Sequence, residues 1–191
     1  MKRPDYDQES GKQILDAAGI AQKIAELGQH IVKEFGADGG GVALVGIQTR
    51  GAHLARRLAA WLTQKTGQDV PVGILDITLY RDDVLTIAEQ PTVKETDLPF
   101  DLEDRPLVLV DDVLFTGRTI RSAMNAIVDY GRPKCVRLAI LIDRGHRELP
   151  ISADYVGLAV TTRRDDIVDV NLMEVDGSDS VCVRPDPKDA V

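Results

Sequence analysis

The stretch VLVDDVLFTGRT, residues 108–119, carries the strongest structural signal in the sequence. It begins as an apolar run typical of a buried strand, passes through two acids and a short loop, and enters a helix that we predict over 117–130. Gly117 lets backbone amides approach an anion closely, and the helix N-terminus adds unpaired N–H groups. With hydroxyl donors from Thr116 and Thr119, the stretch predicts a phosphate-binding loop.

The two acids of this stretch, Asp111 and Asp112, follow a predicted strand over 107–110. Carboxylates only accept hydrogen bonds, so the pair is suited to two hydroxyls of a neighbouring diol or to a metal ion. A Walker B strand would need a G-x-x-x-x-G-K-[ST] loop, and a dinucleotide-binding fold would need G-x-G-x-x-G after its first strand; neither motif is in the sequence. A phosphorelay receiver would carry its acidic pair nearer the N-terminus.

A second anion-binding turn is predicted where the first buried strand ends, in the sequence GIQTRG over 46–51. A strand that leads through such a turn into a helix presents an array of backbone amides. Arg50 adds a guanidinium suited to bidentate contact with phosphate, and Thr49 lies beside it.

Buried strands alternate with helices along the chain, which predicts an α/β fold with a mostly parallel sheet covered on both faces. Ligands of such sheets bind at the carboxyl ends of the strands. Helices are predicted over 10–35, 52–65 and 117–130, and strands over 42–47, 70–80, 107–110, 136–142 and 167–175. The segment 81–106 has three prolines and eight acids against three bases, a composition typical of a functional lid, a hairpin or an insertion.

The length of 191 residues predicts one domain, and 43% hydrophobic and 28% charged residues are typical of a globular protein. The net charge of −8 disfavours a dedicated nucleic-acid-binding protein. The sequence has no apolar run long enough to span a bilayer, so we expect a cytoplasmic protein without membrane association.

The hydrophobic run, acidic pair and T-G-R-T loop resemble the phosphoribosyl-pyrophosphate (PRPP) motif of the type I phosphoribosyltransferases. The resemblance implies that fold, with catalytic Asp111 and Asp112 holding the ribose hydroxyls. It implies that Thr49 and Arg50 contact pyrophosphate in a turn that often contains a non-proline cis peptide. The remaining residues that it assigns to PRPP or nucleotide binding are Val113, Leu114, Phe115, Thr116, Gly117, Arg118 and Thr119.

Three further strings are similar to those members of the family that make UMP and pyrophosphate from uracil and PRPP and also regulate pyrimidine operons. The strings are VGIQTRGAHLARRLA (45–59), DITLYRDD (76–83) and LIDRGHRELPISADYVG (141–157). The similarity implies a single domain over 1–183 with a tail over 184–191, a flexible loop over 81–106 and a hood over 144–166. It also implies that Arg81 contacts pyrophosphate, that Arg144 and Val160 lie on the uracil side, that Mg²⁺ binds with PRPP, and that the chain forms dimers or tetramers.

The second function that this similarity implies is UMP-dependent attenuation through binding of operon leader RNA. His146 and Arg147 are the candidate RNA contacts, and the stretch 118–147 carries a local charge of +5. Ser152 and Leu158, however, stand where RNA-regulating relatives tend to carry basic residues. Two alternatives remain open: an RNA regulator with secondary transferase activity, and a transferase for another nucleobase.

Overall fold

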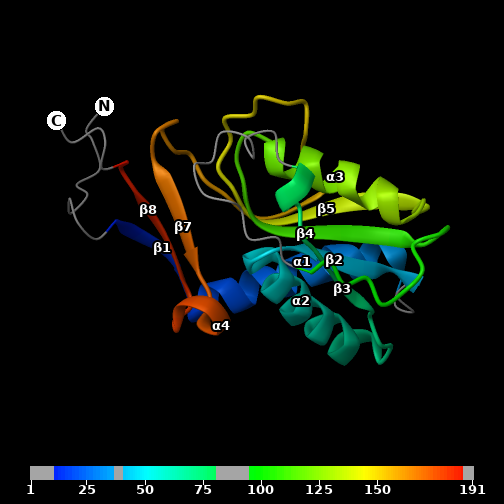
Figure 1. Ribbon diagram of the computed structural model, residues 1–191. Coiled ribbons are helices and arrows are strands. Elements are labelled where there is room, and N and C mark those ends of the chain that lie inside the picture. The colour runs from blue at the N-terminus through cyan, green and yellow to red at the C-terminus, as the bar shows by residue number, and fades with distance from the viewer. Residues whose placement is uncertain (1–10, 37–40, 81–94, 187–191) are drawn as a thin grey trace.

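The computed structural model of the protein describes residues 11–36, 41–80 and 95–186 (Figure 1). Its elements in chain order are β1 (Lys12–Asp16), α1 (Ala17–Phe35), β2 (Ala43–Ile47), α2 (Arg50–Thr66), β3 (Val72–Leu75), the 3₁₀ helix η2 (Thr78–Tyr80), β4 (Pro106–Leu114), α3 (Arg118–Tyr130), β5 (Cys135–Asp143), β6 (Tyr155–Ala159), β7 (Ile167–Asn171), α4 (Met173–Asp176) and β8 (Ser180–Arg184). None of the helices in these ranges is long and apolar enough to cross a membrane.

A central sheet of five parallel strands, in the order β3-β2-β4-β5-β6, confirms the predicted fold class. Helices α1 and α2 cover one face and α3 covers the other (Figure 1). The strands are apolar on both sides because each face packs against helices: Leu44 and Val108 contact the layer of α1 and α2, whereas Val45 and Leu109 contact α3. The two cores hold β2 and β4, and therefore the segments that follow them, in fixed positions.

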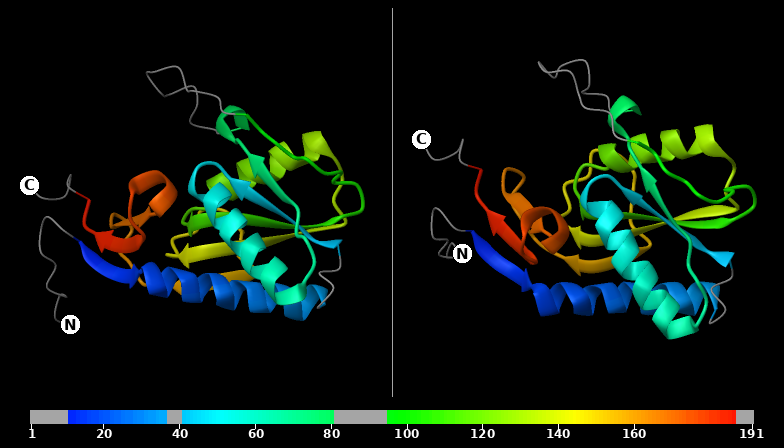
Figure 2. Two further views of the ribbon diagram at one scale, coloured as in Figure 1. Left: turned by 90° about the horizontal axis from the view of Figure 1, so that it is seen from below. Right: turned by 60° about the horizontal axis from the view of Figure 1, so that its bottom comes forward.

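A second, antiparallel sheet of three strands, in the order β1-β8-β7, joins the two ends of the described chain. Figure 2 shows this sheet and α4 beside the start of α2. Val170 and Val181 of this sheet, together with Leu172 directly after β7, belong to the same apolar cluster as α1 and α2. The second sheet is therefore packed against α1 and α2, and it lies near the carboxyl ends of the central strands, where ligands of parallel sheets bind.

The helix predicted over 10–35 begins later than expected. Residues 12–16 form strand β1 against β8, and α1 starts at Ala17 because the Asp16 side chain caps it by accepting a hydrogen bond of 2.7 Å from the Gly19 amide. The predicted helix extended too far because β1 has only five residues, too few to show the alternation of a strand and interrupt the helical spacing.

The strand predicted over 70–80 is interrupted. It ends at Leu75 because the Asp76 side chain accepts hydrogen bonds from the amide and the hydroxyl of Thr78, and the chain turns into η2. The strand predicted over 107–110 continues instead to Leu114, because pairing with β5 extends that far. Asp111 and Asp112 therefore lie within β4 and not after it.

The C-terminal strand and tail also differ from prediction. The strand predicted over 167–175 stops at Asn171 because the Asp176 carboxylate accepts a hydrogen bond of 2.9 Å from the Leu172 amide and turns the chain into α4. Strands β6 and β8 are not predicted from the sequence. Arg184, placed at the start of the tail, belongs to β8 and pairs with Asp169.

Candidate active site

A cavity of about 290 Å³ opens where β2, β3 and β4 end. It brings together side chains from three segments that are distant in the sequence. Its lining residues are Ile47, Gln48, Thr49, Arg50, Asp76, Ile77, Thr78, Asp111, Asp112, Val113 and Thr119. Six of these, namely Thr49, Arg50, Asp111, Asp112, Val113 and Thr119, are among the residues that the sequence assigns to the site. The location is the one expected for a ligand of a parallel sheet.

Asp111 is the most buried of the charged residues that line the cavity. Asp111 is only 6% exposed, and burial raises its pKa well above the usual range, with the charge of Asp112 raising it further. Burial also raises the pKa of Asp112, while an accepted hydrogen bond of 2.9 Å from the Val113 amide and the charge of Arg50 act in the opposite direction. Both carboxyl groups therefore have raised pKa values and line the cavity, and carboxyl groups with perturbed pKa values in a cavity are common at functional sites.

The predicted phosphate loop is held by the segment that follows β5. The carbonyl oxygen of Thr116 accepts hydrogen bonds from the amides of Glu148 and Leu149, and Gly117 adopts a left-handed conformation with φ of 92° before α3 begins. These hydrogen bonds fix the backbone at the start of the loop, and the first amides of α3, which have no intrahelical acceptor, are the groups that could bind an anion. Leu114 and Phe115 lead into the loop, and Thr116, Gly117 and Arg118 form it, but none of these five predicted residues lines the cavity.

The second predicted turn connects β2 to α2. The Gln48–Thr49 peptide bond is cis, as the family resemblance implies. Arg50 is the first residue of α2, and its guanidinium pairs with Asp176 of α4 at 2.8 Å. The turn thus places the cation of Arg50 on the cavity wall. Although Arg50 is far from the acidic pair in the sequence, it is close enough in space for its charge to lower the pKa of Asp112.

The two residues predicted on the uracil side, Arg144 directly after β5 and Val160 directly after β6, are outside the cavity lining. Arg144 is buried, with its guanidinium 4.1 Å from the centre of the Phe115 ring, and it donates hydrogen bonds to the carbonyl oxygens of Arg163 and Arg164. Its Nε atom has no hydrogen-bond partner among the described residues. The amide of Val160 donates to the carbonyl oxygen of Asp143.

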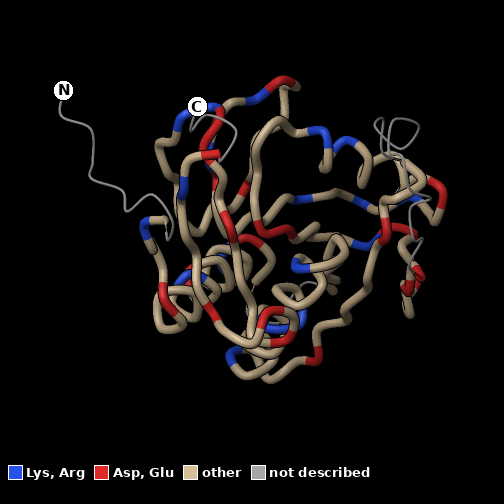
Figure 3. Tube along the Cα trace, turned by 60° about the vertical axis from the view of Figure 1, so that its left-hand side comes forward, with Lys and Arg blue, Asp and Glu red and all other residues tan. Residues whose placement is uncertain are grey.

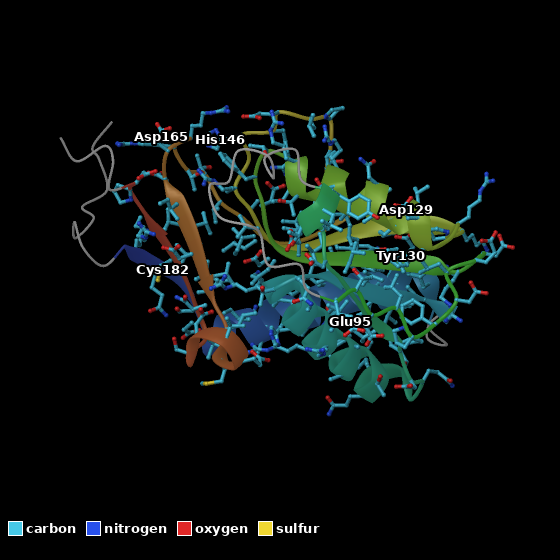
Figure 4. All side chains as sticks on the ribbon, viewed as in Figure 1. Glu95, Asp129, Tyr130, His146, Asp165 and Cys182 are labelled. Atoms are coloured by element: carbon cyan, nitrogen blue, oxygen red, sulfur yellow. The ribbon has the colours of Figure 1, made fainter. Side chains whose placement is uncertain are left out.

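The two residues predicted to contact RNA make internal contacts. Figure 4 labels His146 in the segment after β5, where its Nε2 atom donates to the carbonyl oxygen of Thr162 at 2.9 Å. Arg147 donates to the carbonyl oxygens of Phe115 and Ile151 and pairs with Asp143. Arg147 therefore braces the backbone that leads into the phosphate loop.

Some predictions and some observed residues do not coincide. Arg81, predicted to contact pyrophosphate, lies outside the described residues. Asp76 and Thr78 line the cavity but lie outside the predicted site, and Gln48 lies in the predicted turn over 46–51 without a role assigned to it. The signal for Asp76 was present, because it directly follows the strand next to β2, and carboxyl ends of adjacent parallel strands meet at one edge.

Oxygen donors at the cavity come from Asp76, Asp111 and Asp112, the ligand type that Mg²⁺ prefers. In the described parts of the chain, no three His, Cys, Asp or Glu side chains are grouped closely enough to hold a metal by themselves. A Mg²⁺ ion that brings most of its ligands from substrate oxygens and water fits this donor set.

Comparisons with known proteins assign the chain to a class of proteins. The profile of the phosphoribosyl transferase domain family matches residues 10–177. Among solved structures, a hypoxanthine phosphoribosyltransferase from Staphylococcus aureus superposes with a TM-score of 0.66 at 19% identity over 93% of both chains. One from Trypanosoma cruzi superposes with a TM-score of 0.70 at 17% identity over 98% of this chain and 97% of the other. These structures share the fold, and the chain is a member of the phosphoribosyltransferase family.

Curated relatives show to which group of phosphoribosyltransferases the chain belongs. A protein named bifunctional protein PyrR from Pelotomaculum thermopropionicum is 52% identical over 90% of this chain and 94% of its own length. Proteins of the same name from Deinococcus radiodurans and a Roseiflexus species are 49% and 55% identical, over 92% and 87% of this chain and 95% and 90% of their own lengths. Within the phosphoribosyltransferases, the chain belongs to the PyrR family.

Proposed function

We propose that the protein is a uracil phosphoribosyltransferase, which makes UMP and pyrophosphate from uracil and PRPP. The observation that carries the proposal is one cavity lined by Asp111, Asp112, Thr119, Thr49 and Arg50, in a chain of the PyrR family. In the reaction, the bond from the anomeric carbon to pyrophosphate breaks and a bond to a uracil nitrogen forms, while the proton of that nitrogen is released to water or to pyrophosphate.

Each part of the cavity has a role in this reaction. Asp111 and Asp112 accept hydrogen bonds from the two ribose hydroxyls, and their negative charge stabilises the positive charge that develops on the ribose in the transition state. The loop 116–119 and the start of α3 hold the 5′-phosphate through backbone amides and hydroxyls. Thr49 and Arg50 hold the pyrophosphate group.

We assign Mg²⁺ to the pyrophosphate end of PRPP, with the nearby carboxylates as its protein ligands. When bound, the ion supplies positive charge that neutralises the departing pyrophosphate. We assign Arg81 to the same end, and Arg144 and the backbone at Val160 to the uracil side. The unpartnered, buried Nε of Arg144 supports an assignment in which a ligand oxygen completes its hydrogen bonding.

The choice of base is tested by incubating the protein with PRPP and Mg²⁺ and, in separate reactions, with uracil, cytosine, hypoxanthine or guanine. Nucleotide and pyrophosphate are measured together, so that simple PRPP hydrolysis is recognised by the absence of nucleotide. We expect UMP from uracil and no comparable product from the other bases. Turnover of another base without turnover of uracil would overturn the assignment.

Regulation of a pyrimidine operon through leader RNA is the second candidate function. The observation in its favour is that relatives named bifunctional match over nearly the whole chain at about 50% identity. The charge distribution gives it less support. Arg118 and Arg164 both pair with Glu148, and Figure 3 shows basic and acidic positions interleaved along the chain on the side of the three-stranded sheet.

An electrophoretic mobility shift with the leader RNA of the organism's own pyrimidine operon tests this second function. We expect UMP to strengthen binding, and an RNA of equal length and scrambled sequence serves as control. His146→Ala should weaken the complex if this histidine contacts RNA. Equal, salt-sensitive binding of both RNAs with no response to UMP would indicate only non-specific phosphate contacts and contradict the regulatory function.

We further propose that residues 1–184 act as one phosphoribosyltransferase domain, with the loop over 81–106 and the hood over 144–166, and that the tail begins only after β8, at residue 185. We also propose that the protein works in the cytoplasm as a dimer or tetramer. The packing of the second sheet onto α1 and α2 supports a single unit. Sedimentation of the full chain with and without PRPP measures the oligomeric state.

A further inference from the structure

The arginine assigned to pyrophosphate is reached by a carboxylate from the second sheet. Arg50 begins α2 and lines the cavity, and Asp176 ends α4, between β7 and β8. The Nη2 atom of Arg50 donates to Oδ1 of Asp176 at 2.8 Å, and its Nε atom is 3.3 Å from Oδ2. The contact joins residues that are 126 positions apart in the sequence.

The contact uses one edge of the guanidinium. Arginine has five N–H groups in a planar fork, and Asp176 takes the edge formed by Nε and Nη2. The other edge, formed by Nη1 and the second hydrogen of Nη2, has the geometry for bidentate contact with a phosphate. A carboxylate on the first edge therefore fixes the plane in which the second edge meets a ligand.

Asp176 is itself held in place. Its Oδ2 atom accepts a hydrogen bond of 2.9 Å from the Leu172 amide, at the start of α4. This hydrogen bond, followed by those from Arg50, lowers the pKa of Asp176. The carboxylate therefore stays ionised at neutral pH and does not swing freely.

The same short helix is anchored to α2 at a second point. Arg57 pairs with Glu174 at 2.5 Å and with Asp179 at 2.8 Å. Arg57 lies seven residues after Arg50, about two helical turns, so both arginines point from one face of α2 toward α4. Arg57 does not line the cavity, whereas Arg50 does. Variants of the Arg57 contact therefore test only the packing of α4 on α2, and variants of the Arg50 contact also test ligand binding.

We propose that Asp176 is a positioning residue for the pyrophosphate group of PRPP, acting through Arg50. By holding the Nε edge of the guanidinium, it presents the other edge to the phosphates and removes the need to order a long side chain when the ligand binds. The second sheet thereby takes part in substrate binding without touching the substrate. The inference rests on the proposed function, because that function assigns Arg50 to pyrophosphate.

The test compares Asp176→Asn with Glu174→Gln. Asparagine keeps a carbonyl oxygen for the Leu172 amide but turns an NH₂ group toward the guanidinium. Glu174→Gln removes the same charge from the same helix and leaves Arg57 held by Asp179. Calorimetry with magnesium pyrophosphate should show about tenfold weaker binding for Asp176→Asn, the usual size for loss of a charged hydrogen bond, and no change for Glu174→Gln.

Kinetics give a second readout. The KM for PRPP should rise about tenfold in Asp176→Asn while the KM for uracil stays within about twofold, and Asp176→Glu should recover part of the loss. In an Arg50→Gln background, Asp176→Asn should have no further effect. Unchanged or tighter pyrophosphate binding would overturn the proposal, as would equal losses for PRPP and uracil that follow the melting temperature.

The two hypotheses fail separately. If the wild-type protein turns over no uracil, the proposed function fails, and the calorimetric comparison still decides the role of Asp176. If the wild-type protein makes UMP and Asp176→Asn binds pyrophosphate normally, only the positioning role fails.

Discussion

Replacing Asp112 by asparagine is expected to lower kcat for UMP formation by about 10²–10³-fold, because the variant loses a negative charge placed to stabilise the ribose transition state. The fold should persist, since asparagine has the same shape and retains an oxygen to accept the hydrogen bond from the Val113 amide. Asp69→Asn is the control, because this exposed residue lies in the loop that enters β3 from the opposite end of the sheet. Initial rates with saturating PRPP and uracil measure the effect.

The same variant has a stability signature with a defined sign. The pKa of both Asp111 and Asp112 is raised by burial, so the folded chain binds protons more tightly than the unfolded chain. This contribution to stability is present below the unfolded-state pKa, about 4, and is lost as the pH rises through the raised folded-state pKa. Urea denaturation from pH 4 to 7 should therefore show a shallower loss of unfolding free energy for Asp112→Asn than for the wild type.

Two results would contradict the roles given to the acidic pair. Near-normal turnover of Asp112→Asn would remove Asp112 from catalysis. If Asp112→Asn lost stability more steeply with rising pH than the wild type, the surroundings would stabilise the ionised form of Asp112, and its pKa would be lowered and not raised.

Gly51→Ala is expected to lower the free energy of unfolding by about 2–3 kcal/mol, the upper range for overpacking. A Cβ atom at this position would lie 2.5 Å from the carbonyl oxygen of Val110 and 3.2 Å from the Cα atom of Asp111. Backbone cannot move aside as a side-chain tip can, so α2 must shift away from β4. Helix propensity alone would give the opposite sign, because alanine is favoured over glycine by about 1 kcal/mol.

The activity of Gly51→Ala should fall as well, because the shift separates Arg50 from the acidic pair; we expect the KM for PRPP to rise about tenfold or more. Gly19→Ala is the matched control, since its Cβ atom would meet only side-chain atoms of Leu15 and Asp16, at 3.0 Å or more. Thermal denaturation and PRPP kinetics measure both variants. Wild-type stability together with wild-type KM in Gly51→Ala would show that the close approach of α2 to β4 is not required.

Features that depend on neighbouring residues could be predicted from the sequence. The apolar runs identified β2, β3, β4 and β5 of the central sheet but not β6. The acidic pair with its glycine and threonines indicated a phosphate-binding loop, because this signal lies within about twelve consecutive residues. The turn at Thr49 and Arg50 followed from the same reasoning. The rule that ligands bind at the carboxyl ends of parallel strands then placed both turns at one edge of the sheet.

Features that depend on contacts between distant segments were decided by the tertiary structure alone. β1 carries no clear period and is a strand only because β8, about 170 positions later, pairs with it. The burial that raises the pKa of Asp111 requires α2 to pack within van der Waals contact of β4. The pairing of Arg50 with Asp176 likewise needs the whole fold, because a residue pattern encodes local conformation, whereas the distance between two charges is set by everything packed between them.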